Sequence, residues 1–229
     1  LAALALANSC STEDNGLSSS ENNLKQVTLK VSADGALTRA ISDGTSVDQL
    51  VYRVFDKNGN AITTLNKTTE TATDLLSGHT VTLTLAKGQT YKIAFWAQKA
   101  GCAAYTVDDN MNVSIDYSGV NNDESRDAFF KTVELTVNED MTQDVTLKRP
   151  FAQINVGTTN TDWTAATAAG LTVTQSKVTV KKAANKLNVV DGTVSGATDV
   201  TYTEANLPGE PLMVDADGDG TKDSYKYLS

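Results

Sequence analysis

Aspartates at alternate positions give this chain its clearest spacing for metal chemistry. Asp215, Asp217 and Asp219 lie two residues apart, and Asp223 occupies the ninth position of the same loop. In calcium loops alternate carboxylates converge on one hard cation, and a glycine at the sixth position, also present here, permits the sharp turn. The twelfth position, where a bidentate glutamate is typical, holds Lys226. The spacing therefore predicts either a calcium site formed by the four aspartates or an acidic hairpin tip.

Side chains suited to acid-base or nucleophilic catalysis are few. The one histidine, His79, lies in a turn-like Ser-Gly-His-Thr segment, and Cys102 lies between a glycine and an alanine. A catalytic thiol requires an activating base, and no pair of carboxylates stands out by its spacing. The chain is therefore predicted not to be an enzyme, and Cys102 is expected to be a small buried residue.

One arginine lies in a run that favours an exposed turn. Arg39 precedes Ala40 in the segment Leu-Thr-Arg-Ala-Ile-Ser-Asp-Gly, whose small polar residues and glycine are typical of turns. Exposed loops are where a trypsin-like protease can reach the backbone. Among the other three arginines Arg126 is the main competitor, but a cut there would split a domain and free no terminal strand. Proteolytic processing between Arg39 and Ala40 is predicted, the alternative being a solvated loop residue.

The first residues look like the end of an export signal. Residues 1–9 are apolar or small, Cys10 follows, and a Ser-, Asn- and Glu-rich stretch continues to residue 23. The apolar run is much shorter than the roughly 20 residues that span a bilayer. We interpret residues 1–9 as the remnant of a bacterial lipoprotein signal peptide, Cys10 as the lipidation site, and residues 10–23 as a flexible tether. The alternative is an ordinary signal peptide with an incidental cysteine.

A strand pattern leads directly into the Arg39 turn. Val27, Leu29 and Val31 alternate with polar residues, which predicts a strand with one buried and one solvated face. A cut after Arg39 would make this strand removable and would leave its sheet with an open edge. Open edges pair readily with strands of another chain.

The remaining chain consists of short alternating runs separated by turn residues, with no long helical pattern. Hairpins are predicted at Asn58-Gly59 and across residues 87–89, and Asp108–Arg126 is expected to be a long surface loop. One short helix is expected at residues 162–169. Strands are predicted at residues 24–32, 50–56, 80–86, 90–98, 131–137, 143–148, 151–156, 171–174, 177–180, 187–190, 199–203, 211–214 and 224–228. The pattern predicts an all-β fold with β-sandwich domains at 24–148 and 149–229, the second of them incomplete.

The charge of the chain restricts its partners. Twenty-eight acidic residues against 19 basic ones give a net charge of -9. A phosphate-rich partner would be repelled, so neither nucleic acid nor an anionic membrane surface is an expected partner.

Several segments together resemble the fimbrillins, the fimbrial subunit family of Bacteroidales. They are the run ending at Cys10, the Arg39 turn, the segment Leu50–Asp56 with its Asn-Gly turn, and Leu147–Val156. The resemblance implies two transthyretin-like, Greek-key β-sandwich domains in tandem and export as a lipoprotein to the outer membrane and cell surface. It further implies cleavage by an Arg-specific surface protease, polymerisation with other fimbrial subunits by donor-strand exchange, and a role in adhesion.

In this resemblance Cys10 carries the lipid, Arg39 precedes the cut, and Val27, Leu29 and Val31 belong to the strand that is displaced. The second domain of the family continues beyond residue 229, so the chain is expected to be a piece of a longer protein.

Two alternatives remain open. The chain could be a fimbrial anchor or tip subunit, or a surface lipoprotein that binds a glycan or a protein without polymerising. A glycan-binding surface would use an exposed aromatic platform, and both tryptophans, Trp96 and Trp163, are expected to lie in the core.

Overall fold

The computed structural model describes residues 23–34, 44–119, 123–152 and 154–229 of the chain. The fold is all-β, as predicted, with one short α-helix. Residue contacts divide the chain into two units, of which unit 1 contains the segments up to residue 116, 124–150 and 186–195. Unit 2 contains residues 117–123, 151–185 and 196–229. Both units are discontinuous, whereas the domains predicted from the sequence are continuous.

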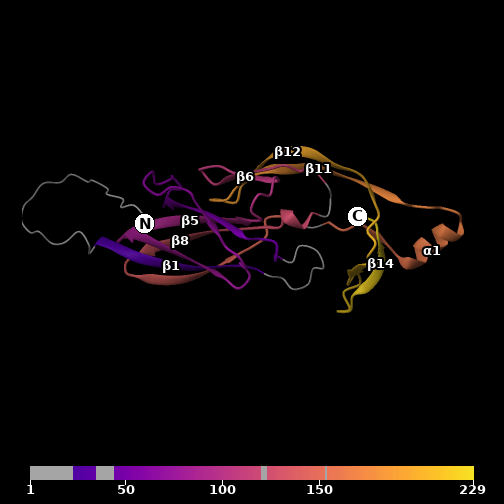
Figure 1. The fold of residues 1–229 in the computed structure, drawn as a ribbon, viewed down its shortest axis with the longest axis horizontal. Coiled ribbons are helices and arrows are strands. Elements are labelled where there is room, and N and C mark those ends of the chain that lie inside the picture. Colours follow the sequence, from indigo (N-terminus) through magenta and orange to yellow (C-terminus); the bar gives the residue numbers. More distant parts are fainter. Residues whose placement is uncertain (1–22, 35–43, 120–122, 153) are drawn as a thin grey trace, which may run out of the picture. The chain divides into compact units, whose positions relative to one another are not determined.

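Two sheets of unit 1 form a β-sandwich. One sheet has the strand order β4-β1-β9 and the other the order β3-β2-β5-β8. In Figure 1 strand β1 runs along one side of β5 and β8. The strands are β1 (Leu24–Ala33), β2 (Gln49–Asp56), β3 (Thr68–Thr71), β4 (His79–Ala86), β5 (Gln89–Gln98), β8 (Ala128–Val137) and β9 (Met141–Leu147).

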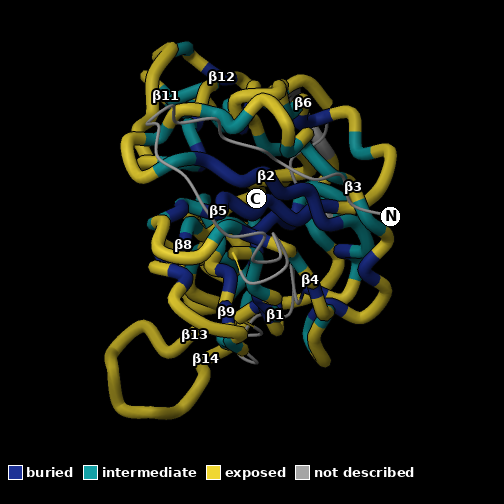
Figure 2. The backbone as a smooth tube through the Cα atoms, turned by 90° about the vertical axis from the view of Figure 1, so that its left-hand side faces the viewer, coloured by how far each residue is buried: buried dark blue, intermediate teal, exposed yellow. Residues whose placement is uncertain are grey.

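The core between these sheets follows the alternation of the sequence. Val27, Leu29 and Val31 of β1 have no exposed surface, and Ile93 and Phe95 of β5 are equally buried in the same cluster. Side chains of a strand point alternately to its two faces, so each apolar residue of the pattern reaches this core. Figure 2 shows the buried β2 and β5 between β6 on one side and β1, β4 and β9 on the other.

The connection from β4 to β5 is not the hairpin that the sequence suggested. β4 pairs with β1, whereas β5 pairs with β2 and β8, so the turn at Gly88 carries the chain from one sheet to the other. Val81 of β4 and Ile93 of β5 still meet in one core. Alternation identifies the buried face of a strand but not its hydrogen-bonding partner, which explains the error.

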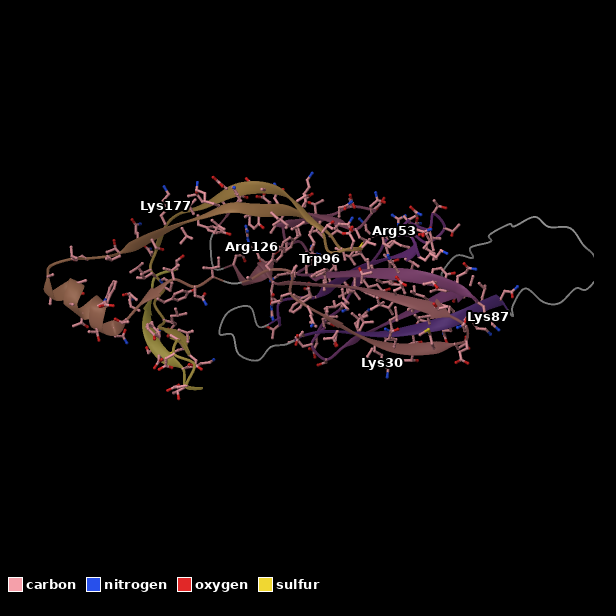
Figure 3. All side chains as sticks on the ribbon, turned by 180° about the vertical axis from the view of Figure 1, so that it is seen from behind. Lys30, Arg53, Lys87, Trp96, Arg126 and Lys177 are labelled. Atoms are coloured by element: carbon pink, nitrogen blue, oxygen red, sulfur yellow. The ribbon has the colours of Figure 1, made fainter. Side chains whose placement is uncertain are left out.

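The other face of β2 and β5 is also covered. Strands β6 (Tyr105–Val107) and β7 (Asn112–Ile115) form a hairpin there, and β7 lies inside the stretch predicted to be a loop. Trp96 of β5 is fully buried, as expected, and its ring meets Tyr105 edge-on at 5.3 Å between centroids. Figure 3 shows Arg53 and Trp96 on the side of the sheet opposite to Lys30 of β1.

A buried ion pair links the start of β8 to the end of β9. Asp127, whose side chain is 3% exposed, accepts hydrogen bonds from Nε and Nη2 of Arg149 at 2.8 and 2.9 Å. The guanidinium also lies 4.5 Å from the ring centre of Phe129. Phe129 and Phe130 both belong to β8, and only Phe129 lies in the core cluster.

Replacing Asp127 with alanine should destabilise unit 1 by about 3–5 kcal/mol, because a nearly buried arginine loses its counter-ion. Chemical denaturation monitored by tryptophan fluorescence measures the loss. Asp144→Ala, which removes an exposed carboxylate from β9, is the matched control and should cost less than about 0.5 kcal/mol. Equal losses in the two variants would contradict the role assigned to the pair.

Unit 2 has little buried surface. Its sheet has the order β10-β14-β13, formed by Gly157–Thr158, Asp223–Tyr227 and Leu212–Val214. Strands β11 (Gln175–Asn188) and β12 (Val194–Asn206) are paired with each other, and their turn belongs to unit 1. The strands predicted at 151–156 and 171–174 are wrong, because no strand forms in the described residues of either segment.

The predicted helix exists but begins earlier than expected. Helix α1 spans Asn160–Ala168, and the hydroxyl of Thr159 accepts a hydrogen bond from the amide of Asp162 at its first turn. The helix buries none of its residues. Trp163 is partly exposed rather than in the core, and the ammonium of Lys226 lies 5.1 Å from its ring centre. No helix in the described part of the chain is long and apolar enough to cross a membrane.

Candidate assembly site

Strand β1 is the central strand of its sheet. It pairs antiparallel with β4 from Leu24 to Val31 and parallel with β9 from Val27 to Ala33. The sequence predicted that its removal would leave one open edge. Because β1 has a partner on each side, its removal would instead open a slot between two unpaired strands, with the core exposed beneath it.

Hydrogen bonds beyond the ladders hold both ends of β1. At its beginning the amide of Lys87 donates to the carbonyl of Asn23 at 2.7 Å, and the amide of Gln26 donates to Asp140 Oδ1 at 2.8 Å. At its end the amides of Ala33 and Asp34 donate to the carbonyls of Leu75 and Leu147 at 3.0 and 2.9 Å. The strand is therefore fixed in one register along its whole length.

A replacement strand must satisfy one face only. Val27, Leu29 and Val31 fill the core, whereas Lys30 is exposed on the outer side of the strand (Figure 3). Burial of each apolar side chain stabilises by about 1.5–3 kcal/mol, and each ladder hydrogen bond adds about 0.5–1.5 kcal/mol. Any strand with apolar residues at three alternate positions could supply most of this stabilisation.

The predicted processing and lipidation residues, Arg39, Ala40 and Cys10, lie outside the described residues. The other arginines are all held by contacts. Arg53 is 9% exposed, Arg126 Nη1 donates to the carbonyl of Asp116 at 3.2 Å, and Arg149 forms the ion pair with Asp127. A protease that requires a flexible chain would find each of these three poorly presented.

The single histidine belongs to a cluster that joins the two sheets. Glu70 of β3 accepts a hydrogen bond from the Tyr52 hydroxyl at 2.6 Å and contacts Nε2 of His79, the first residue of β4, at 2.8 Å. Burial, followed by the bond to Glu70 and its charge, raises the pKa of Tyr52 well above its usual value. Cys102 lies elsewhere and is partly exposed rather than buried, contrary to expectation.

Three of the four aspartates predicted to bind calcium come together. Carboxylate oxygens of Asp215, Asp217 and Asp219 lie within 4.8 Å of one another. Asp223 is instead the first residue of β14, where it pairs with Val214 of β13. The Asp215 carboxylate also accepts hydrogen bonds from the amides of residues 218, 219 and 220 at 2.7 to 3.1 Å. These bonds are what a hairpin tip requires, whereas the converging carboxylates are what a calcium site requires. Titration calorimetry with calcium separates the two interpretations of the loop. A heat of calcium binding that the parent chain shows and Asp217→Ala lacks identifies a metal site, whereas no heat with the parent chain identifies a hairpin tip.

Unit 1 contains two turns with the same local sequence, which sequence reasoning missed. Residues 56–60 and 108–112 both have the pattern Asp-x-Asn-x-Asn. In each turn one carboxylate oxygen of the aspartate accepts two backbone amides at 2.8 to 2.9 Å, and the other accepts the last asparagine side chain at 3.0 Å. The fourth residues, Gly59 and Met111, have positive φ. A search for short internal repeats would have found the pair.

These hydrogen bonds lower the pKa values of both aspartates. The Asn60 side chain and then its backbone lower the pKa of Asp56. Burial alone would raise the pKa of Asp108, but hydrogen bonds from Asn112 and Asn110 outweigh it and lower the pKa. Each carboxylate is therefore more stable in its charged form in the folded chain than in the unfolded one.

The stability of unit 1 should fall as the pH drops below about 4, the ordinary aspartate pKa. A lowered folded pKa gives stabilisation that is complete above the unfolded pKa and is lost as the pH falls through the folded pKa. Urea unfolding at a series of pH values measures this dependence. Asp108→Asn removes one titrating group, so the variant should lose less stability than the parent over the same interval, and parallel curves would contradict the assignment.

The fold is similar to that of solved proteins from Bacteroides. A candidate adhesin from Bacteroides thetaiotaomicron VPI-5482 matches with a TM-score of 0.55 and 17% identity, over 90% of this chain and 70% of its own. A candidate polysaccharide-binding protein from the same strain gives 0.52 and 13%, over 89% and 71%. A candidate adhesin from Bacteroides ovatus gives 0.50 and 14%, over 77% and 61%. At these identities the likeness concerns the fold alone, and it agrees with the predicted β-sandwich.

Sequence comparison leads to a family without an assigned activity. No curated protein matches the chain. A family model covers residues 19–215, which is most of the sequence and includes β1, the Arg39 turn and all of unit 1's strands. The chain therefore belongs to the family of unknown function DUF6562.

Proposed function

We propose that this chain is a cell-surface adhesion protein that assembles into fimbriae by exchanging its first strand. The observation that carries the proposal is the position of β1, which lies between β4 and β9 and buries Val27, Leu29 and Val31 completely. The strand ends at Ala33, six residues before Arg39, so one cut in the intervening stretch would separate it from the rest of the chain. The sharing of a fold with candidate adhesins supports the adhesive role.

In this proposal export precedes processing. The chain is lipidated at Cys10 and carried to the outer membrane, where an Arg-specific surface protease cuts between Arg39 and Ala40. The other partners are further copies of the chain or other fimbrial subunits. An incoming strand then restores two ladders and a core face in one step, which is β-strand addition in a protein-protein interface.

The energetics explain why a cut would trigger assembly. The three apolar side chains of β1 and its two ladders together contribute an amount comparable with the whole stability of a domain, about 5–15 kcal/mol. A subunit that has lost β1 is therefore unstable until another strand fills the slot. Before the cut the covalent connection keeps the slot filled and prevents premature pairing.

Amino-terminal sequencing of protein extracted from the cell surface, together with immunogold electron microscopy, tests the proposal. We expect a mature chain that begins at Ala40 and label along surface filaments. A mature chain that begins only at Cys10 would contradict the maturation step. Label on the membrane without filaments would instead favour the alternative of a surface lipoprotein that does not polymerise.

A further inference from the structure

Three turns of unit 1 enclose a cavity of about 340 Å³ on the side of β2 and β5 that faces away from β1. The cavity volume lies in the range of about 300–1,000 Å³ that is usual for small-molecule sites. Its walls come from the two Asp-x-Asn-x-Asn turns, at 56–60 and 108–112, and from the turn between β11 and β12 at 188–193. The lining residues are Phe55, Asn58, Gly59, Asn60, Ala61, Lys92, Asn110, Asn188, Val190 and Asp191.

The turns at 108–112 and 188–193 are hydrogen-bonded to each other and to the sheet beneath them, and the turn at 56–60 is held by its own hydrogen bonds at the end of β2. The amide of Val189 donates to the carbonyl of Met111 at 3.0 Å, and the Thr132 hydroxyl of β8 donates to the carbonyl of Val189 at 2.6 Å. Arg53 of β2 donates through Nη1 to the carbonyl of Asp109, next to Asn110. The cavity is therefore built on fixed elements, which reduces the ordering that a ligand would have to impose.

Several polar groups in the cavity wall have no partner among the described residues. The side-chain amides of Asn58 and Asn110 form no hydrogen bond there, although the backbones of both residues are held in the turns. The Nδ2 group of Asn188 is likewise unused, since only its Oδ1 is engaged, by the amides of residues 190 and 191. The turn geometry thus uses the backbone for structure and leaves these three amides available to a ligand.

We propose that this cavity binds a neutral sugar residue of a glycan. The side-chain amides of Asn58 and Asn110 each present a donor and an acceptor in one plane, and Asn188 adds the Nδ2 donor, which suits neighbouring hydroxyl groups that both donate and accept. Lys92 and Asp191 add one positive and one negative charge, so the wall has no cationic surplus for a phosphate or a carboxylate ligand. Val190, which is partly exposed, provides an apolar surface for the C–H face of a sugar ring.

A nucleobase fits the same wall less well. Base recognition by proteins usually includes stacking on an exposed aromatic ring. The one aromatic residue of the lining, Phe55, is 1% exposed and offers no such platform. In place of the aromatic platform expected from the sequence, the free amides of Asn58 and Asn110 would hold a sugar through its hydroxyl groups.

The test uses the full, uncut chain on an array of neutral and acidic oligosaccharides, followed by titration calorimetry with the strongest neutral array glycan. Asn58→Ala and Asn110→Ala each remove one free amide and should weaken binding by roughly three- to tenfold, the effect of one or two hydrogen bonds. Asn66→Ala removes an exposed amide outside the cavity and should leave affinity unchanged. Both cavity variants should keep the parental melting temperature, because neither side chain is bonded in the fold.

Three results would overturn the inference: no array glycan bound, binding restricted to acidic glycans, or parental affinity in both cavity variants. The inference does not depend on strand exchange, because the cavity is complete in the uncut chain. A failure here leaves the assembly proposal standing, and a chain that never polymerises can still bind the sugar.

Discussion

Cutting the chain after Arg39 with an Arg-specific protease is expected to convert a monomer into an assembling protein. The cut leaves β1 held by its two ladders and by Val27, Leu29 and Val31, but no longer by the chain. Exchange with another strand then becomes intermolecular. Light scattering combined with intact-mass analysis should show polymers that contain only chains starting at Ala40.

Arg39→Gln is the matched control for this experiment, since it keeps a polar residue at this position and removes the cleavage site. The variant should remain monomeric under the same protease treatment. Polymers formed by the uncut variant would contradict the idea that proteolysis is the trigger. Cleavage at Arg126 or Arg149 in the folded protein would show that the contacts of these residues do not protect them.

Leu29→Asp is expected to prevent unit 1 from folding. The substitution removes a fully buried leucine, a loss of about 2–5 kcal/mol, and places a carboxylate in an apolar core, which adds a further cost of several kcal/mol. The sum reaches the whole stability of a typical domain. Circular dichroism and the loss of the fluorescence signal of buried Trp96 report the outcome.

Lys30→Asp is the control for Leu29→Asp, because Lys30 is the next residue of β1 and is exposed on its outer face. This variant introduces the same aspartate side chain into the same strand, one residue further along the chain. A fold retained by this variant and lost by Leu29→Asp would establish that β1 acts through its inner face. If both variants fold equally well, β1 contributes little to the core and the account of the slot is wrong.

The surroundings of β1 restrict the side chains of a replacement strand more than its direction. β1 is antiparallel to β4 and parallel to β9, so a strand of either direction would form one antiparallel and one parallel ladder. Apolar residues at alternate positions are needed in both cases, because a shift by one residue would turn them to the solvent. The donor of a neighbouring subunit should therefore be recognisable by its pattern.

The sequence predicted β1 and its buried face because alternation of Val27, Leu29 and Val31 is a local signal. It could not predict the central position of the strand, since the partner β9 lies more than a hundred residues away in the chain. The same limit explains the wrong hairpin between β4 and β5. Pairing depends on which strands meet after collapse, and alternation carries no information about it.

The cavity of unit 1 was missed for a different reason. Its groups come from three short polar turns, and such turns were interpreted only as connections. The repeated pattern at 56–60 and 108–112 was available in the sequence. The sequence did not show that both turns lie beside the turn at 188–193. This third turn joins β11 and β12 but belongs to unit 1, which is formed mainly by earlier residues.

Unit 1 is expected to need a strand in the β1 slot but not a covalent connection to it. The most direct measurement mixes a chain that begins at Ala40 with a synthetic peptide of residues 24–33 and records binding and melting temperature. The account predicts a one-to-one complex that restores a monomer with the melting behaviour of the uncut chain. A stable, monomeric chain without the peptide, or a chain that fails to bind it, would contradict the account.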